Sequence, residues 1–129
     1  MSPGGRLAET YPLQYADVPS AANFARNEAT SEHRDSIYIG YRYYDKVGAP
    51  VRYPFGHGLS FTQFAYSDLQ AGARSARVTV ENTGNRRSTE TVQLYVEAPG
   101  SGVGEFRAPR ELAGFAKLEL APGERGTVE

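Results

Sequence analysis

The sequence predicts a mainly β protein whose second half forms an antiparallel β-sandwich with too few strands. Residues 76–81 and 91–96 alternate between apolar and polar side chains, which is typical of strands with one buried face. The 129 residues include 14 glycines and 8 prolines, a share that favours a turn-rich β chain over a helix bundle. Roughly four or five short strands follow residue 64, whereas such a sandwich needs about seven.

The first half of the chain is less regular. Residues 1–36 are polar and contain three prolines, so we expect mostly loop. Residues 37–44 are rich in isoleucine and tyrosine, which predicts a strand, and residues 45–48 then read as a turn. His57 lies between two glycines, a pattern that indicates an irregular loop.

Turn signals separate the expected strands of the second half. Residues 82–85 (NTGN) predict a turn between the two alternating segments, with Gly84 at positive φ. Residues 98–108 contain three glycines and predict a long loop. Pro122 and Gly123 occupy the central positions expected of a type II turn, before a last strand that starts near residue 126.

Composition excludes several classes of function. The net charge is −1, so no nucleic acid or anionic membrane surface is expected as a partner. No apolar run approaches the 18 residues of a membrane-spanning helix. The chain has no cysteine, and its two histidines, His33 and His57, do not form a metal-binding signature, so we expect no metal.

Several motifs, in order along the chain, resemble the C-terminal region of glycoside hydrolase family 3 β-glucosidases. The first group resembles the end of the α/β sandwich domain of those enzymes and its linker: residues 5–12 (GRLAETYP), 37–45 (IYIGYRYYD) and 54–62 (PFGHGLSFT). The second group resembles the fibronectin type III-like, immunoglobulin-like domain that closes them: residues 80–84 (VENTG), 92–96 (VQLYV), 109–115 (PRELAGF) and 120–124 (LAPGE).

The resemblance implies a domain organisation. Residues 1–60 correspond to the tail of the α/β sandwich domain and the linker, and residues 61–129 to a C-terminally truncated fibronectin type III-like domain. The parent enzyme carries a barrel and the rest of the α/β sandwich, and these missing domains are the expected partners of this chain. The resemblance further implies that the parent enzyme hydrolyses β-glucosides without a cofactor. Enzymes of this kind are secreted, periplasmic or cytoplasmic, so the resemblance does not assign a cellular compartment.

The same resemblance places both catalytic carboxyl groups of the parent upstream, so we expect no catalytic residue here. A retaining glycosidase needs two carboxyl groups about 5 Å apart, one as nucleophile and one as acid/base. A chain without the matched pair is expected to be inactive alone, and to contribute domain packing and stability instead. The rival hypothesis is a free-standing fibronectin-like module that binds a protein or a glycan.

Four residues in the matched motifs are candidates for substrate binding in the parent: Arg42, Tyr43, Asp45 and His57. Tyrosine rings suit the face of a sugar, but a tyrosine-rich segment can equally pack at a domain edge. Arg42 and Asp45 can form an ion pair across the end of the expected strand. His57 can carry a proton near neutral pH, or it can be held by backbone hydrogen bonds in a tight loop.

Overall fold

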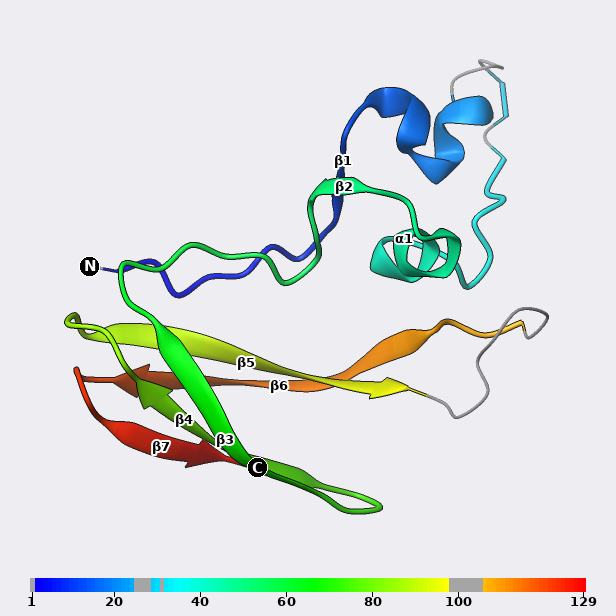
Figure 1. Cartoon of the computed structure of the whole chain (residues 1–129). Coiled ribbons are helices and arrows are strands. Elements are labelled where there is room, and N and C mark those ends of the chain that lie inside the picture. The colour runs from blue at the N-terminus through cyan, green and yellow to red at the C-terminus, as the bar shows by residue number, and fades with distance from the viewer. Residues whose placement is uncertain (1, 25–28, 31, 98–105) are drawn as a thin grey trace. The chain divides into compact units, whose positions relative to one another are not determined.

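A computed structural model describes residues 2–24, 29–30, 32–97 and 106–129 (Figure 1). Most of the expected loop 98–108 therefore lies outside the described residues. Strands dominate, with one short α-helix and two 3-10 helices, which confirms the mainly β fold. In chain order the elements are β1 (Tyr11–Pro12), η1 (Tyr15–Asp17), η2 (Pro19–Ala22), α1 (Tyr41–Val47), β2 (Val51–Tyr53), β3 (Phe64–Ala71), β4 (Ala76–Asn82), β5 (Ser88–Glu97), β6 (Arg110–Leu120) and β7 (Arg125–Val128).

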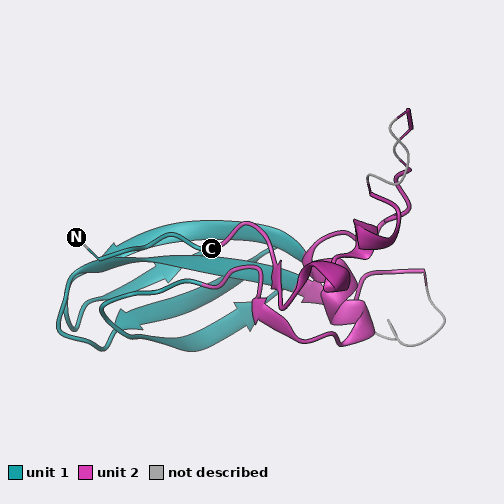
Figure 2. Ribbon diagram, turned by 90° about the horizontal axis from the view of Figure 1, so that it is seen from above, with its two compact units in different colours: residues 1–6, 58–95, 112–129 teal, residues 7–57, 96–111 magenta. Residues whose placement is uncertain are grey.

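The chain divides into two compact units, which Figure 2 colours teal and magenta. Unit 1 consists of Met1–Arg6, Gly58–Tyr95 and Leu112–Glu129, and unit 2 of Leu7–His57 and Val96–Glu111. Each unit therefore joins segments that are far apart in the sequence.

Unit 1 contains the β-sandwich. Its first sheet has the strand order β3-β4-β7, and β5 pairs with β6 in the second. The register between β3 and β4 pairs Tyr66 with Val80, and that between β4 and β7 pairs Val80 with Gly126. Both pairings are antiparallel, as the alternating sequence pattern predicts. Within the described residues the sandwich has five strands, β3 to β7, so the expected shortage of strands is confirmed.

The core of the sandwich is small and lies between the sheets. Val80 and Leu120 are 0% and 1% exposed, and Val92 is 9% exposed. Around them pack four partly buried apolar side chains: Phe64, Val78, Leu118 and Val128. The strand alternation places these residues on the inner faces, so the hydrophobic pattern of the sequence identified the core strands correctly.

The expected strand over residues 37–44 is wrong, because this segment leads into the helix α1. Gly40 takes φ 54° and ψ −135° at the N-cap, and Gly48 takes a left-handed conformation at the C-cap. Between these glycines the chain completes two turns and buries Tyr44, which is 6% exposed. The strand preference of tyrosine reflects packing on a sheet, so helical packing of one aromatic face overrides it.

Residues 1–36 contain more local order than expected. Two 3-10 helices, η1 and η2, follow each other, and Pro19 opens the second. The strand β1 pairs antiparallel with β2, so that Tyr11 lies opposite Tyr53. Short 3-10 turns and a two-residue strand leave little periodicity in a sequence, which explains why a loop was expected.

Residues 82–85 lie at the turn between β4 and β5, as predicted, but the expected positive φ at Gly84 is wrong. A Cβ atom on Gly84 would lie 3.0 Å from the backbone nitrogen of Gln63 and collide with the Thr62 hydroxyl. The glycine is needed for close approach to residues 62–63 and not for a left-handed backbone.

Asn82, just before Gly84, is a fully buried hydrogen-bonding centre. Its side-chain nitrogen donates to the carbonyls of Arg86 (2.7 Å) and Leu120 (3.0 Å), and its side-chain oxygen accepts from the Thr62 hydroxyl (2.6 Å). Asn82 therefore connects residues 62, 86 and 120 through its side chain, in addition to its place beside the turn. By contrast, Gly123 has φ 73°, as its expected turn requires.

Candidate functional site

Three of the four sequence candidates, Arg42, Tyr43 and Asp45, lie on α1 in unit 2. Asp45 receives a bidentate ion pair from Arg110, with Nε–Oδ2 at 2.7 Å and Nη2–Oδ1 at 3.2 Å. Arg42 pairs with Glu111, with Nε–Oε1 at 3.7 Å. The expected ion pair between Arg42 and Asp45 is therefore wrong, because each side chain pairs with residues 110–111 instead.

The aromatic side chains of this segment pack against one another. The ring of Tyr43 meets the ring of Tyr44 edge to face at 5.3 Å. Tyr41 packs on Phe55 at 4.9 Å, and these pairings place the rings of α1 against protein. Burial raises the pKa of the Tyr44 hydroxyl, and the charges of Tyr43 and Asp17 raise it further.

His57, the fourth candidate, is held in place by backbone hydrogen bonds. Its amide donates to the Pro54 carbonyl at 3.0 Å, and its own carbonyl accepts from the Leu7 amide at 2.8 Å. The imidazole ring lies 5.0 Å from the ring of Tyr53, tilted by 35°. The contacts of His57 thus involve the β1–β2 region of unit 2, whereas Arg42 and Asp45 both meet residues 110–111.

These contacts limit the chemistry that the four candidates can perform. Both carboxylate oxygens of Asp45 accept hydrogen bonds from the guanidinium of Arg110, and this bidentate geometry fixes the position of the carboxylate. Such a carboxylate is suited to holding a structure together. To bind a sugar hydroxyl, it would have to share or give up one of these bonds.

A second feature, which the sequence analysis did not identify as a site, is an open apolar cleft in unit 1. It has a volume of about 570 Å³ and lies between strands of the two sheets. Exposure rises along the inner face of β5, from 9% at Val92 to 38% at Leu94. Its main apolar lining residues are Tyr66, Leu69, Val78, Val92, Leu94 and Phe115. The shortage of strands in the sequence was the only signal for it.

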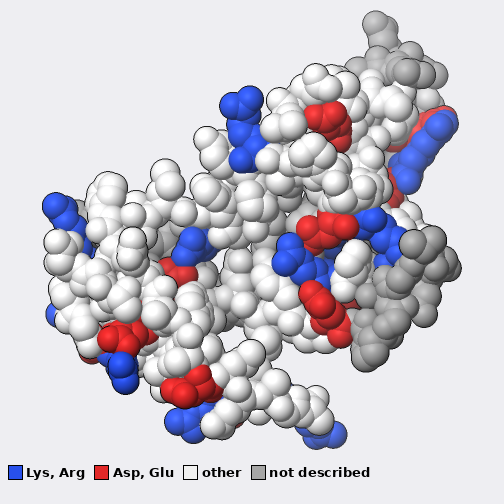
Figure 3. Space-filling model, viewed as in Figure 1, with Lys and Arg blue, Asp and Glu red and all other residues white. Residues whose placement is uncertain are grey.

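Charge is distributed without a dominant sign. The face shown in Figure 3 carries basic and acidic side chains interspersed, in keeping with 14 basic and 15 acidic residues in the chain. Within residues 2–24, 29–30, 32–97 and 106–129, no group of three or more histidine or carboxylate side chains is arranged to hold a metal. In the same residues, no helix has the length and apolar character needed to span a membrane.

Comparison with known sequences connects this geometry to a family. A sequence profile of the fibronectin type III-like domain matches residues 90–129. The chain is 43% identical over 128 residues to a probable β-glucosidase K of Emericella nidulans, covering 99% of this chain and 15% of that protein. It is 40% identical to the thermostable β-glucosidase B of Acetivibrio thermocellus, of which it covers 18%.

Solved structures agree with the sequence comparison. The family 3 β-glucosidase of Bifidobacterium adolescentis superposes with a TM-score of 0.86 at 41% identity, over 99% of this chain and 19% of that one. β-Glucosidase 3B of Thermotoga neapolitana, solved in complex with glucose, gives 0.87 at 37% identity, over 98% of this chain and 19% of that one. The resemblance found in the sequence is therefore confirmed: over nearly its whole length, this chain is similar to a C-terminal part of glycoside hydrolase family 3 β-glucosidases that includes a fibronectin type III-like domain.

Proposed function

We propose that this chain is a non-catalytic part of a longer family 3 glycoside hydrolase and contributes packing and stability to it. One observation carries the proposal: β-glucosidases match 99% of this chain, yet the chain spans 15% to 19% of the length of those relatives. The reaction of the longer protein is the hydrolysis of β-glucosides, in agreement with the names of its relatives.

In this proposal the two parts of the sequence have different origins. Residues 1–60 belong to the end of an α/β sandwich domain, and residues 61–129 belong to the fibronectin type III-like domain. The missing barrel and the rest of the α/β sandwich are the packing partners. The cleft of unit 1 supports this role, because exposed apolar surface of that kind marks a place where further polypeptide packs.

The ion pairs of the candidate residues also support a structural role. Asp45 is held by Arg110, and the buried Glu90 is held by Arg6, so neither carboxylate is available as a nucleophile without breaking its pair. In the longer enzyme, Arg42, Tyr43, Asp45 and His57 remain candidates for contact with the substrate. There they would position the sugar, while the upstream aspartate and glutamate carry out the chemistry.

The test is an activity measurement on the purified chain with 4-nitrophenyl β-glucoside. We expect no release of nitrophenol above a buffer blank. A mock purification from cells without the gene detects contaminating activity, and the Asp45→Asn variant prepared in the same way tests whether any remaining activity depends on that carboxylate. Turnover that is present in the unmodified chain and lost in Asp45→Asn would contradict the proposal.

Binding distinguishes the rival hypothesis of a free-standing module. Calorimetric titration with cellobiose is expected to give no heat of binding in the isolated chain, because the proposed sugar contacts need the remainder of the enzyme. Saturable binding with one site per chain, lost on substitution of Tyr43 by alanine, would favour a glycan-binding module.

A further inference from the structure

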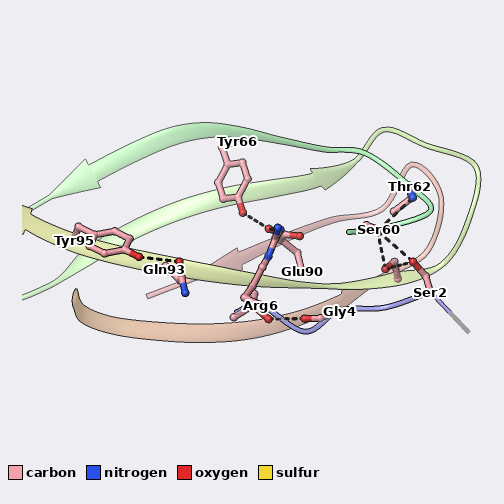
Figure 4. A network of polar contacts seen from close by, with 11 residues as sticks. Ser2, Gly4, Arg6, Ser60, Thr62, Tyr66, Glu90, Gln93 and Tyr95 are labelled. Atoms are coloured by element: carbon pink, nitrogen blue, oxygen red, sulfur yellow. Dashed lines mark hydrogen bonds and ion pairs between the residues drawn. The ribbon is translucent and has the colours of Figure 1, made fainter. Parts of the chain in front are cut away.

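One end of the sandwich is closed by the first residues of the chain. Residues 2–6, which we term the N-terminal strap, meet β5 through side chains (Figure 4). The Ser88 hydroxyl donates to Ser2 Oγ at 2.8 Å, and the Thr91 hydroxyl donates to the Gly4 carbonyl at 2.8 Å. The Phe61 amide donates to Ser2 Oγ at 3.1 Å, so the strap is also bound to the segment that precedes β3.

Two glycines allow the strap to lie this close. A Cβ atom on Gly4 would be 2.7 Å from the Cβ and the carbonyl oxygen of Thr89. A Cβ atom on Gly58 would be 2.7 Å from Arg6 Cδ and 2.7 Å from the Gly5 carbonyl oxygen. All four of these distances are shorter than van der Waals contact, so a side chain at either position would displace the strap.

At the centre of this contact lies a buried carboxylate. The Glu90 side chain is 5% exposed, and its Oε1 accepts from Arg6 Nη2 and from the Tyr66 hydroxyl, the latter at 2.8 Å. Figure 4 shows the guanidinium of Arg6 and the ring of Tyr66 reaching Glu90 from different directions. Burial raises the pKa of the Tyr66 hydroxyl, and its hydrogen bond to Glu90 raises it further, so the hydroxyl remains a donor.

A carboxylate in such a place requires a cation, because an unpaired buried charge is strongly destabilising. In unit 1 Arg6 supplies that cation, from a position 84 residues away in the sequence. We propose that Glu90 and Tyr66 form a guanidinium-binding site on the inner face of the sandwich, and that this site captures Arg6 and thereby determines where the polypeptide enters the fibronectin type III-like unit.

A double-mutant cycle in the full chain tests the coupling. Arg6→Met keeps most of the side-chain volume but leaves Glu90 without its cation, so the thermal midpoint should fall by about 10 °C. Adding Glu90→Gln to Arg6→Met removes the stranded charge, so the double variant should melt above Arg6→Met alone. If the changes in thermal midpoint caused by Arg6→Met and by Glu90→Gln are additive in the double variant, the proposal is overturned.

This cycle remains informative if Arg6→Met does not fold. In that case the double variant is expected to recover a cooperative melt, because the same stranded charge is the reason for the failure. A double variant that fails as completely as Arg6→Met would show that Arg6 acts through packing and not through Glu90.

Chemical rescue tests whether the site recognises the guanidinium group itself. Arg6→Gly leaves room for a small cation, and we expect millimolar ethylguanidinium to raise its melting temperature in a saturable way. Ethylammonium should raise it less, because it lacks the planar fork. The control is Arg6→Gly combined with Glu90→Gln, which should not respond. An equal response in that control, or no response in Arg6→Gly, would overturn the site.

Discussion

The space between the sheets of unit 1 is closed at one end and open at the other. At one end, Ser88 and Glu90 of β5 are buried under the N-terminal strap and satisfied by Ser2 and Arg6. At the other end, Leu94 of the same strand faces an open cleft, and Phe115 of β6 is 70% exposed. The buried core of Val80, Val92 and Leu120 is formed by β4, β5 and β6.

This difference shows that the hydrophobic pattern of a strand assigns residues to a face but does not by itself decide which of them are buried. On β5 the polar residues Ser88 and Glu90 are 4% exposed each, whereas the apolar Leu94 and Val96 are 38% and 54% exposed. The polar residues are covered because the strap supplies donors and a counter-charge. The apolar residues are exposed because no described strand covers them.

The largest effect is expected from breaking the core between the two ends. Leu120→Ala removes a side chain that is 1% exposed, so we expect a loss of about 3 kcal/mol in the free energy of unfolding, measured by urea denaturation. Phe115→Ala, on the neighbouring open face of β6, is the control and should change stability by less than about 0.5 kcal/mol. Equal losses would mean that the cleft is closed in solution.

A smaller loss is expected from forcing the strap away from the closed end. In Gly58→Ala the new Cβ would lie 2.7 Å from the Gly5 carbonyl oxygen, so the backbone must shift, and we expect a cost of about 2 kcal/mol. Gly5→Ala is the matched control, since a Cβ there meets nothing within 4 Å. If urea midpoints for the two variants coincide, the strap does not pack against residue 58.

The hydrogen bond from Tyr66 to Glu90 at the closed end is expected to make stability depend on pH. At pH 7, Tyr66→Phe should cost about 1 kcal/mol, because Glu90 loses one donor. Burial, followed by the bond to Glu90, raises the folded-state pKa of Tyr66 above its unfolded value. Its contribution is therefore fully present below about pH 10 and declines as the pH rises further, since the unfolded state ionises first.

The measurement for Tyr66 is the difference in unfolding free energy between the unmodified chain and Tyr66→Phe at pH 7, 9 and 10.5. That difference should narrow at the highest pH. Tyr15→Phe serves as the control, because Tyr15 is 64% exposed and its ring lies on unit 2. A difference that stays constant with pH would argue against a buried phenol bonded to a carboxylate.

The smallest effect on stability, and the largest on surface behaviour, is expected at the open end. Phe115→Ser should leave the free energy of unfolding in urea within about 0.5 kcal/mol of that of the unmodified chain. It should also lower the fluorescence of the dye ANS bound to the protein and reduce self-association in size-exclusion chromatography, because exposed apolar surface drives both. Unchanged dye binding would place the accessible apolar surface elsewhere.

Sequence patterns were sufficient to predict the β character of residues 64–129, the positions of β4 and β5, the turn at Gly123 and the similarity to family 3 β-glucosidases. Each of these depends on local chemistry or on motifs: side chains alternate with the pleat, and a type II turn needs a residue that accepts positive φ. The same local reasoning failed for α1, because two glycine caps and the burial of Tyr44 outweigh the strand preference of a tyrosine-rich segment.

The pairing of charges and the covering of strand faces could be read only from the folded chain. Asp45 meets Arg110 and Arg42 meets Glu111, over 65 or more residues, where sequence reasoning paired Arg42 with Asp45. Glu90 was not identified from the sequence as a core or site residue, yet it is buried, and Arg6, 84 residues away, supplies its counter-charge. Local sequence patterns indicate which kind of environment a residue prefers. The partner that makes a buried charge tolerable can lie far away in the sequence, because only folding brings the two residues together.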